Sequence, residues 1–549
     1  MIEIDAASTL GETFFRAAAA HAASSLLAVP ANPARGYHAL GIEISYAAAQ
    51  ASVRRLMRAY AHAGYGLGHR IGLMLENRPE HLLHKLALNA LGACCVPLNG
   101  DHRPPELAYV IDHARLDLIV VLAPLQGLLD SALALSAHRP RSASFDDFDR
   151  AEIGLSAAAR PAMSGGPVAD TPASVLYTSG TTGRPKGCVL SHRYELAAGA
   201  WYATRGALVR FDVGRERIYN PLPLFHVNAS VLSFLGALLT GNCQVQSDRF
   251  QTTRWWTEVR ESRATVVHYL GVVVPMLLNQ PPGPQDREHR VRFGIGAGVE
   301  PQLHAVFEAR FGFALVEIWG MTETVRVLID HEPPRQVGTR AFGRAQPGLE
   351  VRVIDEAGRE LPDGQTGEMV LRHSAATPRR DFFSGYLDDP QATEAAWRGG
   401  WFHTGDLVTR APDGMLHFVD RRKNIIRRSG ENIAAAEVEA LLQSHPRVAQ
   451  VAVLAVPDEL REEEVLACVV LRDTAAADLS TTVRALFDHC LENLAYYKAP
   501  GWVWVTDTIP TTATQKVQKH QLFAPGVDPR MLPGMIDLRS LKKRGAAPA

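Results

Sequence analysis

The stretch Ser174–His192 reads SVLYTSGTTGRPKGCVLSH and decides the fold class of the chain. Its first residues, Val175–Tyr177, are apolar and favour a strand, and Ser191 is a suitable N-cap for a helix that follows. Between them lies a segment of hydroxyl residues and glycines that contains Lys186. A strand, a glycine-rich loop and a helix in this order predict a phosphate-binding turn in an α/β protein.

The loop contains the residue types that bind a triphosphate. Glycines let backbone N–H groups turn towards an anion without a Cβ clash, hydroxyls add neutral donors, and Lys186 adds a positive charge. The residues that we expect at the phosphates are Thr178, Ser179, Gly180, Thr181, Thr182, Gly183 and Lys186. The spacing is not that of a Walker A motif, because Lys186 follows Pro185 and precedes Gly187. A flexible linker is the alternative interpretation, and the strand and helix on either side argue against it.

The α/β pattern extends on both sides of the loop. Arg70–Leu75 and Ala93–Leu98 read as buried strands, with a helix at His81–Leu91 between them. Short alternating runs between residues 338 and 419 predict a small β-rich subdomain. A compact α+β unit follows, with helices at Ala434–Gln443 and near Thr481–Asn493 and strands at Val448–Val456, Val465–Leu471 and Trp502–Val505. We therefore predict domains at 1–420 and 424–530 and a flexible tail at 531–549.

Composition narrows the class of protein. The 549 residues include 57 Lys+Arg and 58 Asp+Glu, and this balance argues against a dedicated nucleic-acid binder. The six cysteines form neither a CxxC pair nor a zinc-like spacing with histidine, which suits a reducing compartment. No apolar stretch is long enough to span a membrane, and the first residues do not resemble a signal peptide. We expect a cytoplasmic protein.

The segment YTSGTTGRPKG resembles the signature loop of the adenylate-forming superfamily, which includes acyl-CoA ligases, luciferases and peptide-synthetase adenylation domains. The resemblance runs from about residue 10 to residue 525, in the family's motif order. It implies a large N-terminal domain of α/β layers with a small β-barrel subdomain, followed by a small mobile α+β domain. It also implies a reaction with ATP, Mg²⁺, coenzyme A and a small-molecule carboxylic acid, and the capacity to form a homodimer.

Two further motifs of the resemblance concern the nucleotide. The segment GIGAG at residues 294–298 resembles the strand end on which adenine lies, with Gly296, Ala297 and Gly298 leaving room for a flat ring. The segment EIWGMTE that follows resembles an aromatic-Gly-x-Thr-Glu motif. There the resemblance implies that Trp319 stacks on adenine, Thr322 hydrogen-bonds the α-phosphate and Glu323 holds Mg²⁺.

The other motifs concern the ribose, the hinge and the chemistry. Asp406 in the TGD segment is expected to bind the ribose hydroxyls, and Arg421 the ribose or phosphate. Lys423 matches the hinge position, and Gly430 the loop that lines the pantetheine tunnel.

The remaining two positions lie at the reacting carboxylate. His226, in PLFHVN, is expected to gate the approach of the thiol, although a hydrogen-bonded core histidine is the alternative. Lys516 resembles the catalytic lysine that bridges the carboxylate and the α-phosphate, or it is a surface lysine in a polar turn. Gln515 precedes it where the family usually has Gly, so the backbone of this loop departs from the family pattern.

Several questions stay open at the level of sequence. FHVNAS and VDRRKNIIRRSGENI look most like the crotonobetaine/carnitine–CoA ligase branch, which points to fatty acid or carnitine metabolism. Arg326 can pair with a second carboxylate of the substrate, with a protein carboxylate or with solvent. The alternatives to a CoA ligase are an enzyme that loads a carrier protein and an inactive nucleotide-binding regulator.

Overall fold

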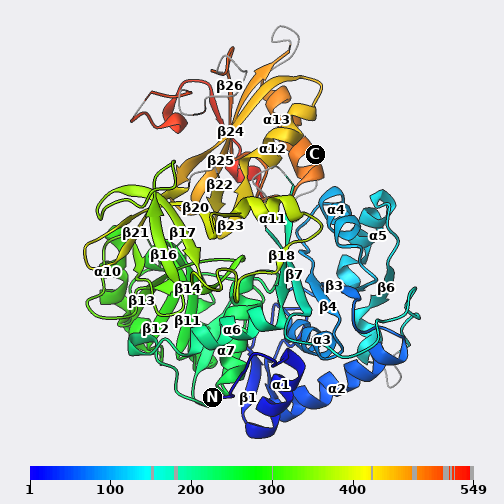
Figure 1. The fold of residues 1–549 in the computed structure, drawn as a ribbon. Helices are drawn as coiled ribbons and strands as arrows, with labels where there is room; N and C mark the ends of the chain where they lie inside the picture. Colours follow the sequence, from blue (N-terminus) through cyan, green and yellow to red (C-terminus); the bar gives the residue numbers. More distant parts are fainter. Residues whose placement is uncertain are drawn as a thin grey trace.

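The computed structural model describes residues 1–149, 154–178, 184–271, 273–299, 301–421, 425–472, 479–510, 519, 522–524 and 526–543. Three sheets build the N-terminal part, and a fourth sheet builds a smaller C-terminal domain that lies above them in Figure 1. This architecture confirms the predicted α/β class with a small C-terminal domain. In the part of the chain that the structure describes, no helix is long and apolar enough to cross a membrane.

The first sheet carries the glycine-rich loop. Its strands run, in spatial order, β18 (Gly385–Tyr386), β8 (Lys186–Ser191), β7 (Pro172–Thr178), β4 (Cys94–Pro97), β3 (Arg70–Met74), β5 (Leu118–Val121) and β6 (Arg141–Ser144). The strands from β7 to β6 pair in parallel, as the apolar runs predict. The helices of this half are α2 (Tyr46–His62), α3 (Pro79–Ala90), α4 (Pro104–Ala114) and α5 (Gln126–Leu135). They surround the sheet in the blue and cyan half of Figure 1.

The second sheet lies beside the first. Its order is β14 (Thr324–Ile329), β13 (Ala314–Met321), β12 (Phe293–Ala297), β11 (Val266–Leu270), β9 (Arg217–Asn220), β10 (Cys243–Gln246), β1 (Ser25–Val29) and β2 (Ile42–Ser45). Its helices are α1 (Leu10–Ala20), α6 (His192–Ala203), α7 (Phe234–Leu239), α8 (Trp255–Glu261), α9 (Val273–Leu278) and α10 (Pro301–Phe311). One buried cluster joins side chains of both sheets, including Leu73 of β3 and Val316 of β13, so the two halves share a core.

The third sheet is antiparallel. It runs β15 (Ala341–Gly343), β21 (Leu416–Arg421), β20 (Trp401–Arg410), β17 (Thr366–Arg372) and β16 (Glu350–Ile354), with β19 (Trp397–Arg398) also paired to β20. Helix α11 (Pro390–Ala396) precedes β19. This curled half-barrel is the β-rich subdomain that the alternating runs between residues 338 and 419 predict.

The C-terminal domain has its own core. Its sheet runs β23 (Glu431–Ala434), β22 (Ile425–Arg428), β25 (Glu462–Leu471), β26 (Trp502–Val505) and β27 (Met535–Asp537), and β24 (Val448–Asp458) pairs with β25. Helices α12 (Ala435–Ser444) and α13 (Leu479–Asn493) pack on this sheet through Val438 and Phe487, which are fully buried. The helices and strands predicted here are present, with ends shifted by a few residues. Within the segment that we expected to be a flexible tail, β27 pairs with β26 and Lys542 is buried.

The region around the loop follows the sequence, with one addition. The Ser191 hydroxyl accepts a hydrogen bond from the backbone N–H of Tyr194 at 3.1 Å and caps α6 as expected. The strand β8, which the sequence did not reveal, lies between the loop and this cap. It pairs with β7 so that Thr178 lies opposite Lys186. Thr178 and Lys186, which flank the glycine-rich segment, are therefore held side by side.

Candidate active site

A cavity of about 1200 Å³ lies between the N-terminal sheets and the C-terminal domain. Seven predicted site residues line it, and they come from five separate motifs: Thr178, Lys186, His226, Thr322, Glu323, Asp406 and Gly430. Residues up to 252 positions apart in the sequence, Thr178 and Gly430, thus meet at one cavity. The size suits a nucleotide with a second ligand.

Some predicted residues are not placed at this cavity. Ser179, Gly180, Thr181, Thr182, Gly183, Lys423 and Lys516 lie outside the residues that the structure describes. Arg421 is described only in its backbone, which pairs with Asp406 across β20 and β21. Among the described cavity-lining residues, Gly296, Ala297, Gly298 and Trp319 do not occur.

Glu323 is buried at the cavity wall. The Tyr386 hydroxyl donates a hydrogen bond to its Oε1 at 2.8 Å. The Lys186 Nζ lies 4.7 Å from the centroid of the same tyrosine ring, a cation–π distance. Tyr194 fixes the preceding residue, because its hydroxyl donates to the carbonyl of Thr322 at 2.7 Å. Tyr386 therefore contacts a carboxylate through its hydroxyl and an ammonium group through the face of its ring.

Glu323 has the chemistry of a Mg²⁺ ligand. Within the described residues no cluster of three or more His, Cys, Asp or Glu could hold a metal. Mg²⁺ is commonly bound through one or two carboxylates, with phosphate oxygens and water completing the octahedral shell. One carboxylate near Lys186, at the end of the predicted phosphate-binding loop, fits this pattern.

The side chain of Asp406 is fixed by a hydrogen bond from the indole of Trp319. The indole Nε1–H donates to Asp406 Oδ2 at 2.8 Å, and both side chains are buried. The backbone N–H of Asp406 donates to the Thr404 hydroxyl at 3.1 Å, and Gly405 N–H donates to Glu368 at 3.1 Å. Trp319 thus orients the carboxylate expected at the ribose.

The glycines at the end of β12 have a structural reason of their own. A Cβ on Gly296 would lie 2.3 Å from the carbonyl oxygen of Tyr269, so no larger residue fits. Gly298 has φ +87°, and its N–H donates to the Glu317 carboxylate at 2.9 Å. Burial raises the pKa of Glu317 to about 7, against the hydrogen bonds that it accepts.

His226 faces the C-terminal domain. Its Nε2 lies 3.6 Å from Glu431 Oε2, which is an ion-pair distance and too long for a hydrogen bond. Burial alone would raise the pKa of Glu431, but His226, Lys498 and His102 together lower it. His226 and Glu431 both line the cavity, one from each domain.

The turn at Ser429 and Gly430 brings the C-terminal domain against the N-terminal domain. Both residues have positive φ, +51° and +85°, and a Cβ on Gly430 would lie 2.1 Å from Leu270 Cδ1. The requirement for glycine here is therefore steric as well as conformational. Leu270 also lines the cavity, so the turn closes one of its walls.

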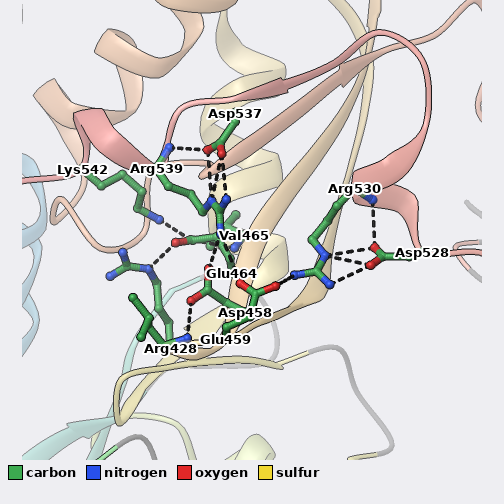
Figure 2. A network of polar contacts seen from close by, with 11 residues as sticks. Arg428, Asp458, Glu459, Glu464, Val465, Asp528, Arg530, Asp537, Arg539 and Lys542 are labelled. Carbon is green, nitrogen blue, oxygen red and sulfur yellow. Dashed lines mark hydrogen bonds and ion pairs between the residues drawn. The ribbon is translucent and has the colours of Figure 1, made fainter. Parts of the chain in front are cut away.

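A buried polar network anchors the residue before this turn (Figure 2). Arg428 Nε donates to Glu464 Oε2 at 2.8 Å, and Lys542 from the last described segment donates to the other oxygen of Glu464. A Cβ on Gly501 would lie 2.4 Å from Glu464 Cγ, so glycine makes room for this carboxylate. The C-terminal segment is thereby tied to the strand that leads into the cavity turn.

Lys498 joins the two domains. Its ammonium donates to Glu106 of α4 at 2.6 Å and to Glu437 of α12 at 2.9 Å, and all three groups are largely buried. Burial alone would lower the pKa of Lys498, but the two carboxylates raise it. Sequence analysis did not single out this residue. A lone lysine in the run LAYYKAP is the signal that could have revealed it, because buried lysines need partners.

Arg326 is paired within the protein. Its Nη2 lies 2.7 Å from Asp381 Oδ2, and its side chain is 13% exposed. Of the three partners considered from the sequence, the structure therefore selects a protein carboxylate.

Comparisons with known proteins give sequence matches over most of the chain. The sequence model of the AMP-binding enzyme family matches residues 25–387, and that of the AMP-binding enzyme C-terminal domain matches residues 437–516. The crotonobetaine/carnitine–CoA ligase of Citrobacter koseri is 29% identical over 497 residues, which cover 87% of this chain and 93% of that protein.

Two solved structures are similar over most of their length. The amide bond synthetase McbA from Marinactinospora thermotolerans has a TM-score of 0.77 at 26% identity, covering 93% of this chain and 98% of that one. A malonyl-CoA ligase in a ternary product complex with methylmalonyl-CoA and AMP has a TM-score of 0.68 at 27% identity, covering 85% and 95%.

Proposed function

This chain belongs to the AMP-binding enzyme family, among the AMP-forming acyl-CoA ligases, and from that premise we propose that it activates a carboxylic acid with ATP and transfers the acyl group to coenzyme A. The observation that carries the proposal is the single cavity lined by Glu323 and Asp406 from one domain and Gly430 from the other. The proposed nucleotide site lies on the N-terminal side of this cavity, and the C-terminal domain, which we expect to move, forms part of its wall.

In the first step the carboxylate oxygen attacks the α-phosphorus of ATP, and pyrophosphate leaves. Negative charge grows on the phosphoryl oxygens, so a cation held at the loop stabilises the transition state. Lys186 supplies a charge there, and Lys516 is our proposed second cation at the α-phosphate. Mg²⁺ held by Glu323 would neutralise phosphate charge.

Asp406 is the proposed ribose ligand. A carboxylate can accept hydrogen bonds from two neighbouring hydroxyls, and Trp319 already occupies one side of Oδ2. Arg421 lies opposite Asp406 in the sheet, at the end of β21. The pair therefore lies where β21 ends, two residues before the proposed hinge at Lys423.

In the second step the CoA sulfur attacks the acyl carbon of the adenylate, and AMP leaves. The arrangement in this structure suits that step, because the Ser429–Gly430 turn lies at the cavity and His226 contacts Glu431. We propose that the C-terminal domain rotates at Lys423 to present Lys516 for the first step.

The test combines purified protein, ATP, Mg²⁺ and CoA with short-chain, long-chain, aryl, diacid and betaine-type acids. AMP release together with a thioester detected by mass spectrometry is the expected result. AMP release that requires a carrier protein or an amine in place of CoA would assign a different acceptor. Absence of pyrophosphate exchange with every acid would favour an inactive nucleotide-binding protein.

We propose a cytoplasmic location. The six cysteines are free and buried, as suits a reducing compartment, and both ATP and CoA are cytoplasmic substrates.

A further inference from the structure

A buried network of amide side chains lies beneath the part of the cavity that contains His226. Asn220 of β9 and Gln244 and Gln246 of β10 are fully buried on neighbouring strands, with Gln246 opposite Asn220. Buried amides are stable only when their polar atoms are hydrogen-bonded, so the contacts of the network determine which way each amide points.

The orientation of Asn220 follows from the backbone. The N–H of Leu222 donates to Asn220 Oδ1 at 3.0 Å, so the oxygen of this amide faces the main chain. The nitrogen of Asn220 then donates to Asn228 Oδ1 at 3.0 Å. Because the oxygen of Asn228 is the acceptor, its NH₂ group points the other way.

The other hydrogen bonds of the network are consistent with this orientation of the Asn220 and Asn228 amides. Gln244 Nε2 donates to the backbone carbonyl of Ala229 at 3.1 Å, so its oxygen faces Ser233. The Ser233 hydroxyl donates to that oxygen at 2.8 Å and accepts from the Asn220 nitrogen at 2.9 Å. Gln246 is fixed in turn by donating to the carbonyl of Leu222 at 3.2 Å. Reversing any one amide would break contacts along the chain.

Asn228 lines the cavity at the start of the π-helical turn Asn228–Ser233. Such turns are rare and occur often at functional sites. Among the described residues the Asn228 side chain is seen bonded only through its oxygen, and Leu222, Pro223 and Val227, near it in the sequence, line the cavity with apolar side chains. A donor that a bound acyl chain covers without offering an acceptor weakens binding, because the donor loses its hydrogen bond to water.

We propose that Asn228 donates a hydrogen bond to an oxygen on the acyl chain, and that the substrate is an acid carrying a hydroxyl or carbonyl oxygen beyond its carboxylate. This inference rests on the proposed function and names its substrate class. A neutral oxygen suits the neutral amide. Arg326, the cation considered for a second carboxylate, pairs with Asp381 and does not line the cavity. Arg249 does line it, so the dicarboxylates in the test below decide between a neutral oxygen and a second carboxylate.

Matched acids test the inference. Butanoate is compared with its 2-, 3- and 4-hydroxy derivatives, pentanoate with 4-oxopentanoate, and each with the dicarboxylate of equal length. The measurement is kcat/KM for AMP formation. We expect the wild type to favour one hydroxy or oxo acid over its plain counterpart by about 10-fold to 100-fold.

Variants assign the preference to the amide. Asn228→Val removes the donor and should bring the ratio close to one, and Asn228→Asp keeps the size but removes the donor and should do the same. Ser230→Ala, a change in the same turn outside the amide network, should preserve the ratio. Thermal unfolding confirms that each variant is folded.

Three outcomes overturn the inference. In the first, the wild type prefers plain acids or dicarboxylates. In the second, both Asn228 variants keep the preference of the wild type for the hydroxy or oxo acid. In either case AMP formation together with a CoA thioester shows that the proposed function stands. Absence of AMP with every acid would instead remove the proposed function and this inference with it.

Discussion

Trp319 and Asp406 lie 87 residues apart in the sequence and share a buried hydrogen bond of 2.8 Å. Trp319 belongs to the second sheet and Asp406 to the half-barrel, so the contact fixes the proposed ribose ligand against the strand that continues to Glu323. A hydrogen bond to a carboxylate is worth about 1.5–3 kcal/mol.

Replacing the indole by a ring without N–H should weaken nucleotide binding. For Trp319→Phe we expect the KM for ATP to rise about 10-fold to 100-fold in pyrophosphate exchange, because Asp406 loses a fixing donor. Phe342→Leu, which alters the packing on Trp319 at a centroid distance of 6.3 Å without touching Asp406, is the control and should change KM much less. An unchanged KM in Trp319→Phe would show that the bond does not matter for ATP.

The ion pair between Lys498 and Glu106 should stabilise the domain arrangement that serves thioester formation, the second step of the reaction. For Glu106→Gln we expect thioester formation from preformed acyl-adenylate to slow about 10-fold, which corresponds to ~1.4 kcal/mol, while adenylation keeps its rate. Lys498 retains Glu437 in that variant. The matched control is Glu437→Gln, because Glu437 belongs to the same domain as Lys498 and should not separate the two half-reactions. Equal slowing of both steps by Glu106→Gln would contradict the role of this pair.

Lys516 should act in the first step alone. We expect Lys516→Ala to abolish adenylation but to leave thioester formation from preformed acyl-adenylate intact. Single-turnover assays of the two half-reactions measure this directly. Equal loss in both would reject Lys516 as the adenylation residue.

Stability should depend on pH through Lys542. Burial lowers the pKa of its ammonium to about 7, against the attraction of Glu464 and with the repulsion of Arg428. An unfolded lysine titrates near ~10.4. Between these values the unfolded chain binds more protons, so the folded state gains stability as the pH rises through that window and loses it as the pH falls through 7.

The comparison with Lys542→Met isolates this effect. From pH 6.5 to pH 9 the unfolding temperature of the wild type should rise relative to that of the variant. Lys543→Met, at the exposed neighbouring lysine, should follow the wild type. Parallel curves for the wild type and Lys542→Met would show that Lys542 keeps an ordinary pKa.

The sequence predicted the strands and helices around the site from short-range patterns, but it did not predict the contacts between residues far apart in the chain. The strand at Val175–Tyr177 and the cap at Ser191 follow from short-range chemistry, whereas β8 was hidden because its residues belong to the motif itself. The pairing of Lys498 with Glu106 spans 392 residues and has no periodicity that a single sequence displays. Trp319 was expected at the adenine ring, and its hydrogen bond to Asp406 depends on how two sheets pack. Its stacking on adenine stays a prediction, as do the roles of Lys423 and Lys516.

The position of Lys498 also has a consequence for the energetics of turnover. Its ammonium lies between carboxylates of both domains, away from water. A cycle that rotates the C-terminal domain must hydrate this charge and dehydrate it again each time. Dissolved ions screen the separated charges and leave the closed pair nearly untouched. The salt concentration of the medium therefore affects how long the two domains stay separated in each catalytic cycle.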